Sequence, residues 1–238
     1  MKTKFAIGCL VQWYEVDIIG EYVDSLKEAI NVYDGEVLVD FVIVMDQQLE
    51  KTSLDRNDWL NLREKIKKII DPIETYDLEI VSSLYTIADY RRDFNNNYCE
   101  SVDVLMWGES DMLVPKQTFN ILDNLHQMSL QNNNPKYLAF FGTCKMWDKS
   151  LEVLIAPQHK FNGCGLVISS EVIKSGVNIP RSVFFVHEDT SFMLMTQKIL
   201  GNIPQYIIKN ILLVHNRNHP KKRMYIKGER KDGTMNEK

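Results

Sequence analysis

Residues Val37 to Met45 read VLVDFVIVM, which is apolar at nearly every position and rich in β-branched side chains. A strand with one solvated face alternates apolar and polar residues, whereas a strand covered by helices on both faces is apolar almost throughout. We therefore predict a central strand of a mainly parallel sheet here. Such a strand requires neighbouring helices, which the flanking sequence supplies.

The flanking segments alternate between strand and helix patterns. Phe5 to Val11 is a compact apolar run that predicts a first strand. Apolar residues then recur at helical spacing from Ile19 to Val32, and again from Leu54 to Ile70, where Asp71-Pro72 ends the pattern. Together with the central strand, these segments predict the alternating order of an α/β fold.

Two further strands are predicted over Leu78 to Leu84 and Val102 to Trp107, with a polar stretch between them. Pro115 opens a predicted helix that ends in a polar run before residue 136. The second half of the chain is more mixed. We predict strands there over Tyr137 to Phe141, Leu151 to Ile155 and Leu166 to Ser169, a helix over Ser191 to Leu200, and a final strand over Gln205 to Val214.

The composition fits one large globular domain. Of the 238 residues, 45% are hydrophobic and 25% are charged, which excludes a disordered chain, a collagen and a disulfide scaffold. The 28 basic and 32 acidic side chains sum to −4, so any attraction to nucleic acid must be local. We predict an α/β domain over residues 1–220, with ligands at the carboxyl ends of its strands, and a basic polar tail over residues 221–238.

The cysteines form no CxxC pair and lie mostly in apolar runs, which predicts buried thiols rather than zinc or redox chemistry. No run of about 18 apolar residues is present, so we predict no membrane-spanning helix and a cytoplasmic protein. The four cysteines are Cys9, Cys99, Cys144 and Cys164.

Two carboxylates follow directly on a predicted strand. Residues Val102 to Pro115 read VDVLMWGESDMLVP, so Glu109 and Asp111 emerge at the carboxyl end of that strand, where an α/β sheet binds ligands. Carboxylate oxygens are the ligands that Mg²⁺ and Mn²⁺ prefer, often together with substrate phosphates. The alternative is a solvated turn in which Asp111 caps the next helix.

Two later segments carry related chemistry. Glu188 and Asp189 follow an apolar run, where a carboxylate can act as a general base or compensate the charge of a helix N-terminus. His215 follows the last apolar run, a position suited to a third metal ligand, and the alternative is a surface histidine. Beyond it, Arg217 and Lys221 belong to a basic cluster that suits a phosphate.

This ordered set of motifs resembles the GT-A fold glycosyltransferases, particularly the family 2-like inverting enzymes. The resemblance covers about residues 1–220 and implies that Asp111, Glu109 and His215 hold Mn²⁺ or Mg²⁺ on a nucleoside diphosphate. Glu109 stands where the family's DxD motif has Asp, and its longer side chain also suits a ribose hydroxyl or a metal-bound water. The motifs are Asp46 after the central strand, Glu109-Ser110-Asp111, Gly163-Cys164-Gly165, Glu188-Asp189 and His215.

The resemblance also implies a catalytic base and a set of donor contacts. Asp189 matches the base of the family's ED motif, with Glu188 as the second choice. The sequence VQWYE replaces the family's PxYN-like segment, and a buried Trp13 or Tyr14 is the alternative to nucleoside stacking. Arg91 and Arg92 are donor contacts or surface charges. The implied donor contacts are Val11, Gln12, Tyr14, Glu15, Asp46, Arg91, Arg92, Asn95, Glu109, Ser110, Arg217 and Lys221.

The implied activity is transfer of a hexosyl or pentosyl group from a nucleotide-sugar donor, with a UDP-sugar favoured, to an acceptor hydroxyl with inversion. The basic segment from Lys209 to Lys231 adds DNA as an acceptor, because the chain is similar in build to phage glycosyltransferases that act on hydroxymethylated cytosine. Two rivals stay open. One is a nucleotidyltransferase, although Val11 to Asp17 lacks its Gly-rich basic loop, and the other is a sugar-nucleotide-binding protein with a decayed site.

Overall fold

The computed structural model describes most of the chain. Asp46, Arg217 and the tail beyond Lys221 lie outside the described residues, so the roles predicted for them stay predictions. The described residues are 1–45, 56–73, 76–81, 85–147, 150, 152–158, 161–183, 187–209, 211–216 and 219–221.

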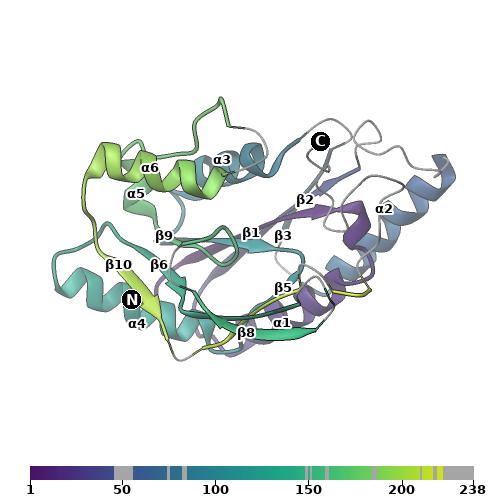
Figure 1. Ribbon diagram of the computed structural model, residues 1–238, viewed down its shortest axis with the longest axis horizontal. Helices are drawn as coiled ribbons and strands as arrows, with labels where there is room; N and C mark the ends of the chain where they lie inside the picture. The colour runs from purple at the N-terminus through teal and green to yellow at the C-terminus, as the bar shows by residue number, and fades with distance from the viewer. Residues whose placement is uncertain are drawn as a thin grey trace.

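Within these residues, seven strands form a central sheet in the order β10-β6-β9-β4-β1-β2-β3 (Figure 1). Neighbouring strands are parallel except at β9, which runs antiparallel to both β4 and β6. The prediction of a mainly parallel α/β sheet is confirmed. The strands are β1 (Phe5–Gln12), β2 (Val37–Val44), β3 (Tyr76–Val81), β4 (Val104–Glu109), β6 (Leu138–Phe141), β9 (Val167–Ser169) and β10 (Gln205–Ile208).

Helices cover both faces of this sheet (Figure 1). On one face, α1, α2 and α4 form a core that includes Tyr22 and Phe41. On the other face, α3, α5 and α6 form a second core that includes Phe94 and Val42. Adjacent residues of β2 thus enter opposite cores, which explains its continuous apolar sequence. The helices are α1 (Ile19–Asn31), α2 (Arg56–Ile70), α3 (Ile87–Tyr98), α4 (Thr118–Gln131), α5 (Ser170–Lys174) and α6 (Glu188–Leu200).

The polar stretch that we expected between two strands is the helix α3. Thr86 caps this helix, since its hydroxyl accepts a hydrogen bond from the Asp89 N–H at 3.1 Å while the Asp89 carboxylate accepts one from the Thr86 N–H at 3.2 Å. Tyr90, Phe94 and Tyr98 follow at four-residue spacing and are buried. A capping box and a narrow aromatic stripe therefore outweigh the polar composition of the segment.

The single final strand that we predicted over Gln205 to Val214 is wrong. The chain forms β10 in the large sheet, leaves it after Ile208, and joins a second sheet as β11. That sheet has the order β5-β11-β7-β8, and Val214 and His215 of β11 pair antiparallel with β5. Its strands are β5 (Met112–Leu113), β7 (Thr143–Trp147), β8 (Val153–Pro157) and β11 (Leu213–His215).

Two helix starts also differ from the predictions. The helix α4 begins at Thr118, whose hydroxyl donates a hydrogen bond to the Pro115 carbonyl at 2.6 Å, so Pro115 precedes the helix. The helix α6 begins at Glu188 instead of Ser191, which places both predicted acidic residues in its first turn.

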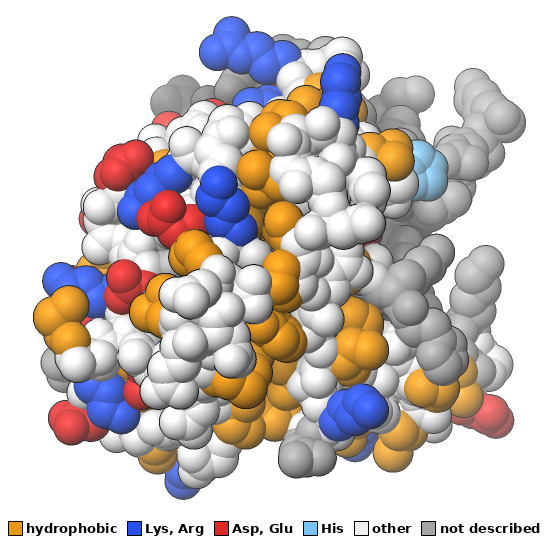
Figure 2. All heavy atoms as spheres, turned by 90° about the vertical axis from the view of Figure 1, so that its left-hand side faces the viewer, with side chains coloured by type: hydrophobic (Ala, Val, Ile, Leu, Met, Phe, Trp, Pro, Cys, Tyr) orange, Lys and Arg blue, Asp and Glu red, His pale blue; other side chains and the backbone are white. Residues whose placement is uncertain are grey.

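The surface that carries the edge strand β10 exposes apolar side chains among interspersed charges of both signs (Figure 2). The large apolar residues exposed on β10 and α6 include Leu194, Ile199 and Ile207. All four cysteines are buried free thiols, as predicted. In the described part of the chain, none of the helices has the length and apolarity needed to cross a bilayer.

Candidate active site

The two carboxylates of the Glu109-Ser110-Asp111 segment lie at the carboxyl end of β4. Glu109 is the last residue of that strand, Ser110 and Asp111 make the turn, and β5 begins at Met112. β4 lies beside β1 in the middle of the sheet, with Leu10 opposite Glu109. The Glu109 side chain keeps 23% of its surface exposed and that of Asp111 keeps 7%, so a ligand can reach Glu109 from solvent.

His215 joins these carboxylates because β11 pairs with β5. The pairing sets His215 opposite Met112, and the Asn216 N–H donates a hydrogen bond to the Asp111 carbonyl. His215 Nε2 then lies 3.1 Å from Glu109 Oε2 and 3.4 Å from Asp111 Oδ1. The three residues that the sequence assigns to a metal are thus brought together from two sheets.

A buried arginine holds the other side of Glu109. Arg91 on α3 donates from Nη2 to Glu109 Oε1 at 2.6 Å and contacts Glu188 Oε1 through Nη1. Its Nη2 also donates to the Gly163 carbonyl at 3.1 Å. A Cβ at Gly163 would lie 2.1 Å from Arg91 Nη1, so only glycine leaves room for the guanidinium. Arg91, Glu109 and Glu188 therefore link α3, β4 and the start of α6.

The charges of the cluster support one another. Burial alone would lower the pKa of His215, but neighbouring Cys164 and the Asp111 carboxylate outweigh it and hold that pKa well above its usual value. Burial would raise the pKa of Glu109, but His215 and Arg91 lower it overall. Burial raises the pKa of Glu188 despite the Arg91 guanidinium. Glu109 and Asp111 together thus favour a positive charge between them.

The donor atoms fit a divalent metal ion. Carboxylate oxygens from Glu109 and Asp111 converge on the Nε2 of His215. Carboxylate oxygens together with an imidazole suit Mn²⁺, and carboxylate oxygens alone suit Mg²⁺. One donor atom each of Glu109, His215 and Cys164 lies within 4.8 Å of the others. The oxygen and nitrogen donors thus suit the predicted Mn²⁺ or Mg²⁺, and the Cys164 sulfur is a further donor beside them.

The fold of the chain is similar to that of several solved structures. TarS from S. aureus matches with a TM-score of 0.59 and 13% identity, over 90% of this chain and 36% of that chain. TarS 1-349 in complex with UDP matches with a TM-score of 0.57 and 12% identity, over 90% of this chain and 60% of that chain. The chain has a GT-A fold.

A third structure agrees with this assignment. The mannosyltransferase PcManGT from Pyrobaculum calidifontis, in complex with GDP-Man and Mn²⁺, matches with a TM-score of 0.56 and 11% identity, over 93% of this chain and 59% of that chain. This GT-A chain spans 36% to 60% of the length of these three structures. No protein-family model and no curated protein sequence matches it.

The predicted nucleoside segment of this GT-A fold supports the acidic turn from behind. Glu15, at the end of the 3-10 helix η1 (Trp13–Glu15), accepts hydrogen bonds from the Gln12 N–H at 2.9 Å and from the Ser110 hydroxyl. Val11, Tyr14 and Glu15 are buried, as is Trp13. Tyr14 thus offers almost no exposed ring face, and donor contacts by these residues stay a prediction.

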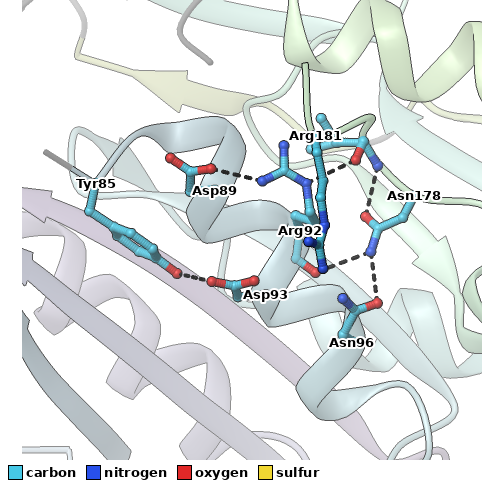
Figure 3. Close-up of a pocket in the computed structure, with 8 residues that line it drawn as sticks. Tyr85, Asp89, Arg92, Asp93, Asn96, Asn178 and Arg181 are labelled. Carbon is cyan, nitrogen blue, oxygen red and sulfur yellow. Dashed lines mark hydrogen bonds and ion pairs between the residues drawn. The ribbon is translucent and has the colours of Figure 1, made fainter. Parts of the chain in front are cut away.

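Arg92 and Asn95 lie apart from the Glu109 cluster. Arg92 donates to the carbonyls of Ile179 and Pro180 at 2.9 Å each and faces a polar pocket of about 540 Å³ on another side of α3 (Figure 3). Asn95 accepts from Trp107 Nε1 at 2.9 Å and donates to Asn178 at 2.9 Å. Both side chains hold the protein together, and the structure does not bring them to the acidic turn. The pocket is lined by Tyr85, Asp89, Arg92, Asp93, Asn96, Asn178, Ile179 and Arg181.

The remaining predicted residues lie near the cluster's margins. Asp189 is half-buried beside Glu188 in the first turn of α6, and its Oδ1 accepts a hydrogen bond from the Thr190 N–H at 2.6 Å. Lys221 is exposed, with its Nζ 3.9 Å from Glu21 Oε1. The same Glu21 accepts a bond from Asn216 Nδ2 at 3.4 Å. The catalytic and donor roles of Asp189 and Lys221 stay predictions.

Sequence reasoning missed two contributors to this site. Asn216 fixes Asp111 through its backbone, and the signal for this was its position directly after His215. Cys164 was interpreted as a buried thiol, which is correct, but its place beside His215 was not foreseen. The two glycines that flank Cys164 were the available signal, because a Gly-X-Gly turn lets a backbone approach its neighbours closely.

Proposed function

We propose that the chain is a metal-dependent glycosyltransferase that moves a sugar from a nucleoside-diphosphate sugar to an acceptor hydroxyl, with inversion at the anomeric carbon. The observation that carries this proposal is the convergence of Glu109, Asp111 and His215 at the carboxyl end of β4 in a GT-A fold. Solved structures of this fold include one with UDP and one with GDP-Man and Mn²⁺, which supports a nucleotide-sugar donor. We propose a UDP-sugar as that donor.

Asp111, His215 and Glu109 would hold Mn²⁺ or Mg²⁺. The bound ion supplies positive charge for the diphosphate that leaves when the sugar is transferred. Arg91 keeps Glu109 oriented toward this position, because the guanidinium is 2% exposed and is bound on both sides by carboxylates. Glu15 holds the turn by accepting the Ser110 hydroxyl proton in a hydrogen bond. These contacts pre-organise the acidic turn before a donor arrives.

We assign the catalytic base to Asp189. Glu188, the alternative, is held by Arg91 in a structural ion pair. Glu188 would have to leave this ion pair to act as the base, whereas Asp189 lies next to it and outside the pair. The Oδ1 of Asp189 accepts a hydrogen bond from Thr190, and its Oδ2 can receive the proton of the acceptor hydroxyl. Attack by that hydroxyl oxygen forms the new glycosidic bond while the bond to the diphosphate breaks on the opposite side of the anomeric carbon.

The acceptor supplies the hydroxyl that receives the sugar. DNA that contains hydroxymethylated cytosine is the alternative to other hydroxyl acceptors, and it draws support from the basic side chains Lys209 and Lys221 together with the basic residues beyond them in the sequence. The described side chains on the face shown in Figure 2 mix both signs of charge without forming a continuous basic stripe, so they give no support for DNA binding there.

The experiment that tests the function is a nucleotide-sugar panel with the purified full chain, Mn²⁺ or Mg²⁺, and a range of acceptors. Release of nucleoside diphosphate, lost in the Asp111→Asn variant, supports a glycosyltransferase, and NMR of the product gives the anomeric configuration. Release of pyrophosphate from a nucleoside triphosphate and a sugar phosphate would instead favour the nucleotidyltransferase. Binding of a nucleotide sugar without any turnover would favour the decayed site.

A further inference from the structure

The turn Gly163-Cys164-Gly165 is fixed from two sides. The Gly163 carbonyl accepts a hydrogen bond from Arg91, and a side chain at this position would collide with the guanidinium. The Gly165 N–H donates to the Trp107 carbonyl at 2.9 Å, and Gly165 has a φ of +72°, a conformation that favours glycine. The residue between them is therefore held in one place.

This turn directs Cys164 into the acidic cluster. Its backbone N–H donates to the Asn162 side chain at 3.0 Å, and the residue is 5% exposed. The Cys164 sulfur, a carboxylate oxygen of Glu109 and a ring nitrogen of His215 all lie within 4.8 Å of one another. In a tetrahedral zinc site, sulfur and nitrogen ligands lie about 3.5 Å apart. Side-chain movements of about 1 Å would bring these donor atoms to the separations found between the ligands of a metal ion.

We propose that Cys164 is a metal ligand together with His215 and Glu109, so that the site binds thiophilic divalent ions, of which Zn²⁺ and Co²⁺ are examples, in preference to Mg²⁺. Thiolate sulfur favours such ions, whereas Mg²⁺ takes oxygen ligands. On binding, the Cys164 thiol releases its proton to solvent and His215 coordinates as a neutral imidazole. This inference rests on the proposed function for the role of the metal site in the protein. A measurement of metal binding, without sugar transfer, is enough to test whether Cys164 is a ligand.

The competing interpretation is a thiol that only fills space. The Cys164 sulfur lies 4.0 Å from Met112 Sδ, as an apolar packing partner would. The two interpretations differ in what they predict for metal binding. A space-filling thiol leaves Co²⁺ affinity and spectrum unchanged when it is replaced, whereas a ligand does not.

The test is a Co²⁺ titration of the full chain under reducing conditions, without nucleotide. We expect a near-ultraviolet sulfur-to-cobalt charge-transfer band that disappears in Cys164→Ser, with Co²⁺ affinity lowered by about tenfold or more. The matched control is Cys99→Ser, because Cys99 is a buried thiol at the end of α3 and should keep the band. Competition with Mg²⁺ should need a large excess in the wild-type chain and a smaller one in Cys164→Ser.

A second measurement covers a Cys164→Ser chain that fails to fold. In the wild-type chain, Zn²⁺ should slow alkylation of Cys164, read by peptide mass spectrometry, while the rate at Cys99 stays unchanged. Absence of a charge-transfer band, or equal alkylation rates with and without Zn²⁺, would overturn the proposal. Mn²⁺-dependent sugar transfer without the band would support the proposed function and overturn the role of Cys164 as a ligand. The band without any sugar transfer would support Cys164 as a ligand and contradict the proposed function.

Discussion

Arg91 lies 2.6 Å from Glu109 through its Nη2, and both residues are anchored on elements that meet only in the folded chain. Replacing Arg91 with methionine keeps the volume but leaves the carboxylates of Glu109 and Glu188 without their shared cation. Removing one partner of a buried ion pair is costly, so we expect the free energy of unfolding to fall by about 3 kcal/mol in urea denaturation.

The control for this change is Arg91→Met combined with Glu188→Gln. Neutralising one of the stranded carboxylates should recover part of the lost stability, since the penalty comes from uncompensated charge. If the double variant is less stable than the single one by the full cost of Glu188→Gln alone, Arg91 and Glu188 are not coupled.

Asp111→Asn should abolish stabilisation by metal and nucleotide. A ligand that binds only the folded chain at 100 times its Kd stabilises it by about 2.7 kcal/mol, so wild-type melting with Mn²⁺ and UDP should shift upward by several degrees. The variant should melt at the same temperature with and without these ligands. Asp34→Asn, at an exposed position after α1, should behave as the wild type does.

Asp189→Asn should lower kcat by about a hundredfold or more, because the acceptor hydroxyl loses its proton acceptor. The KM for the donor should stay nearly constant, since the residue is not assigned to donor binding. Glu188→Gln should lower thermal stability through its contact with Arg91. An undiminished kcat in Asp189→Asn, with a strongly reduced one in Glu188→Gln, would move the base to Glu188.

Gly163→Ala should displace Arg91 and destabilise the chain by about 1–3 kcal/mol, because the added Cβ would lie 2.1 Å from Arg91 Nη1. Chemical denaturation measures the change. Gly20→Ala is the matched control, since a Cβ on this α1 residue lies 3.8 Å from Ile69 and alanine favours helices. We expect that control to be neutral or stabilising, and a comparable loss in both variants would speak against the Arg91 clash.

Acid should destabilise the chain partly through His126. Burial lowers the pKa of this histidine, with Asp103 and Asp123 opposing only in part, and its Nδ1 lies 3.2 Å from the Tyr137 hydroxyl. Because the folded-state pKa is lowered, the unfolded chain binds the proton first as the pH falls. The contribution of neutral His126 to the free energy of unfolding is therefore fully present at neutral pH and is lost as the pH drops below about 6.5. His126→Gln should flatten the curve of unfolding free energy between pH 7 and 5.

The sheet was readable from the sequence because its signal is local. The continuous apolar run of β2 and the acidic residues at the end of β4 are short stretches of sequence. Their periodicity or position is enough to predict the structure. The small sheet was not readable in the same way. Lys209 and Asn210 interrupt the apolar run from Gln205 to Val214 where the chain changes sheets. Because both halves of the run are apolar, the local pattern does not tell which distant strand each half meets.

In the candidate site, too, some positions follow from the local sequence and others depend on how distant elements pack. Glu109 and Asp111 lie at the carboxyl end of a central strand, as their place in the sequence predicts. His215 reaches them from the second sheet, because β11 pairs with β5. By contrast, Arg91 and Arg92 are neighbours in sequence but diverge, because adjacent residues on a helix point about 100° apart. Which of the two reaches Glu109 depends on how α3 packs, and that is decided by Tyr90, Phe94 and the capping box.

β11 is the strand that carries His215 to its place opposite Met112, and it follows all seven strands of the large sheet in the chain. During synthesis the N-terminal strands emerge first, and pairing between distant segments forms slowly. Glu109 and Asp111 are therefore synthesised well before their histidine partner. The three side chains can meet only after β11 has been made and has paired with β5.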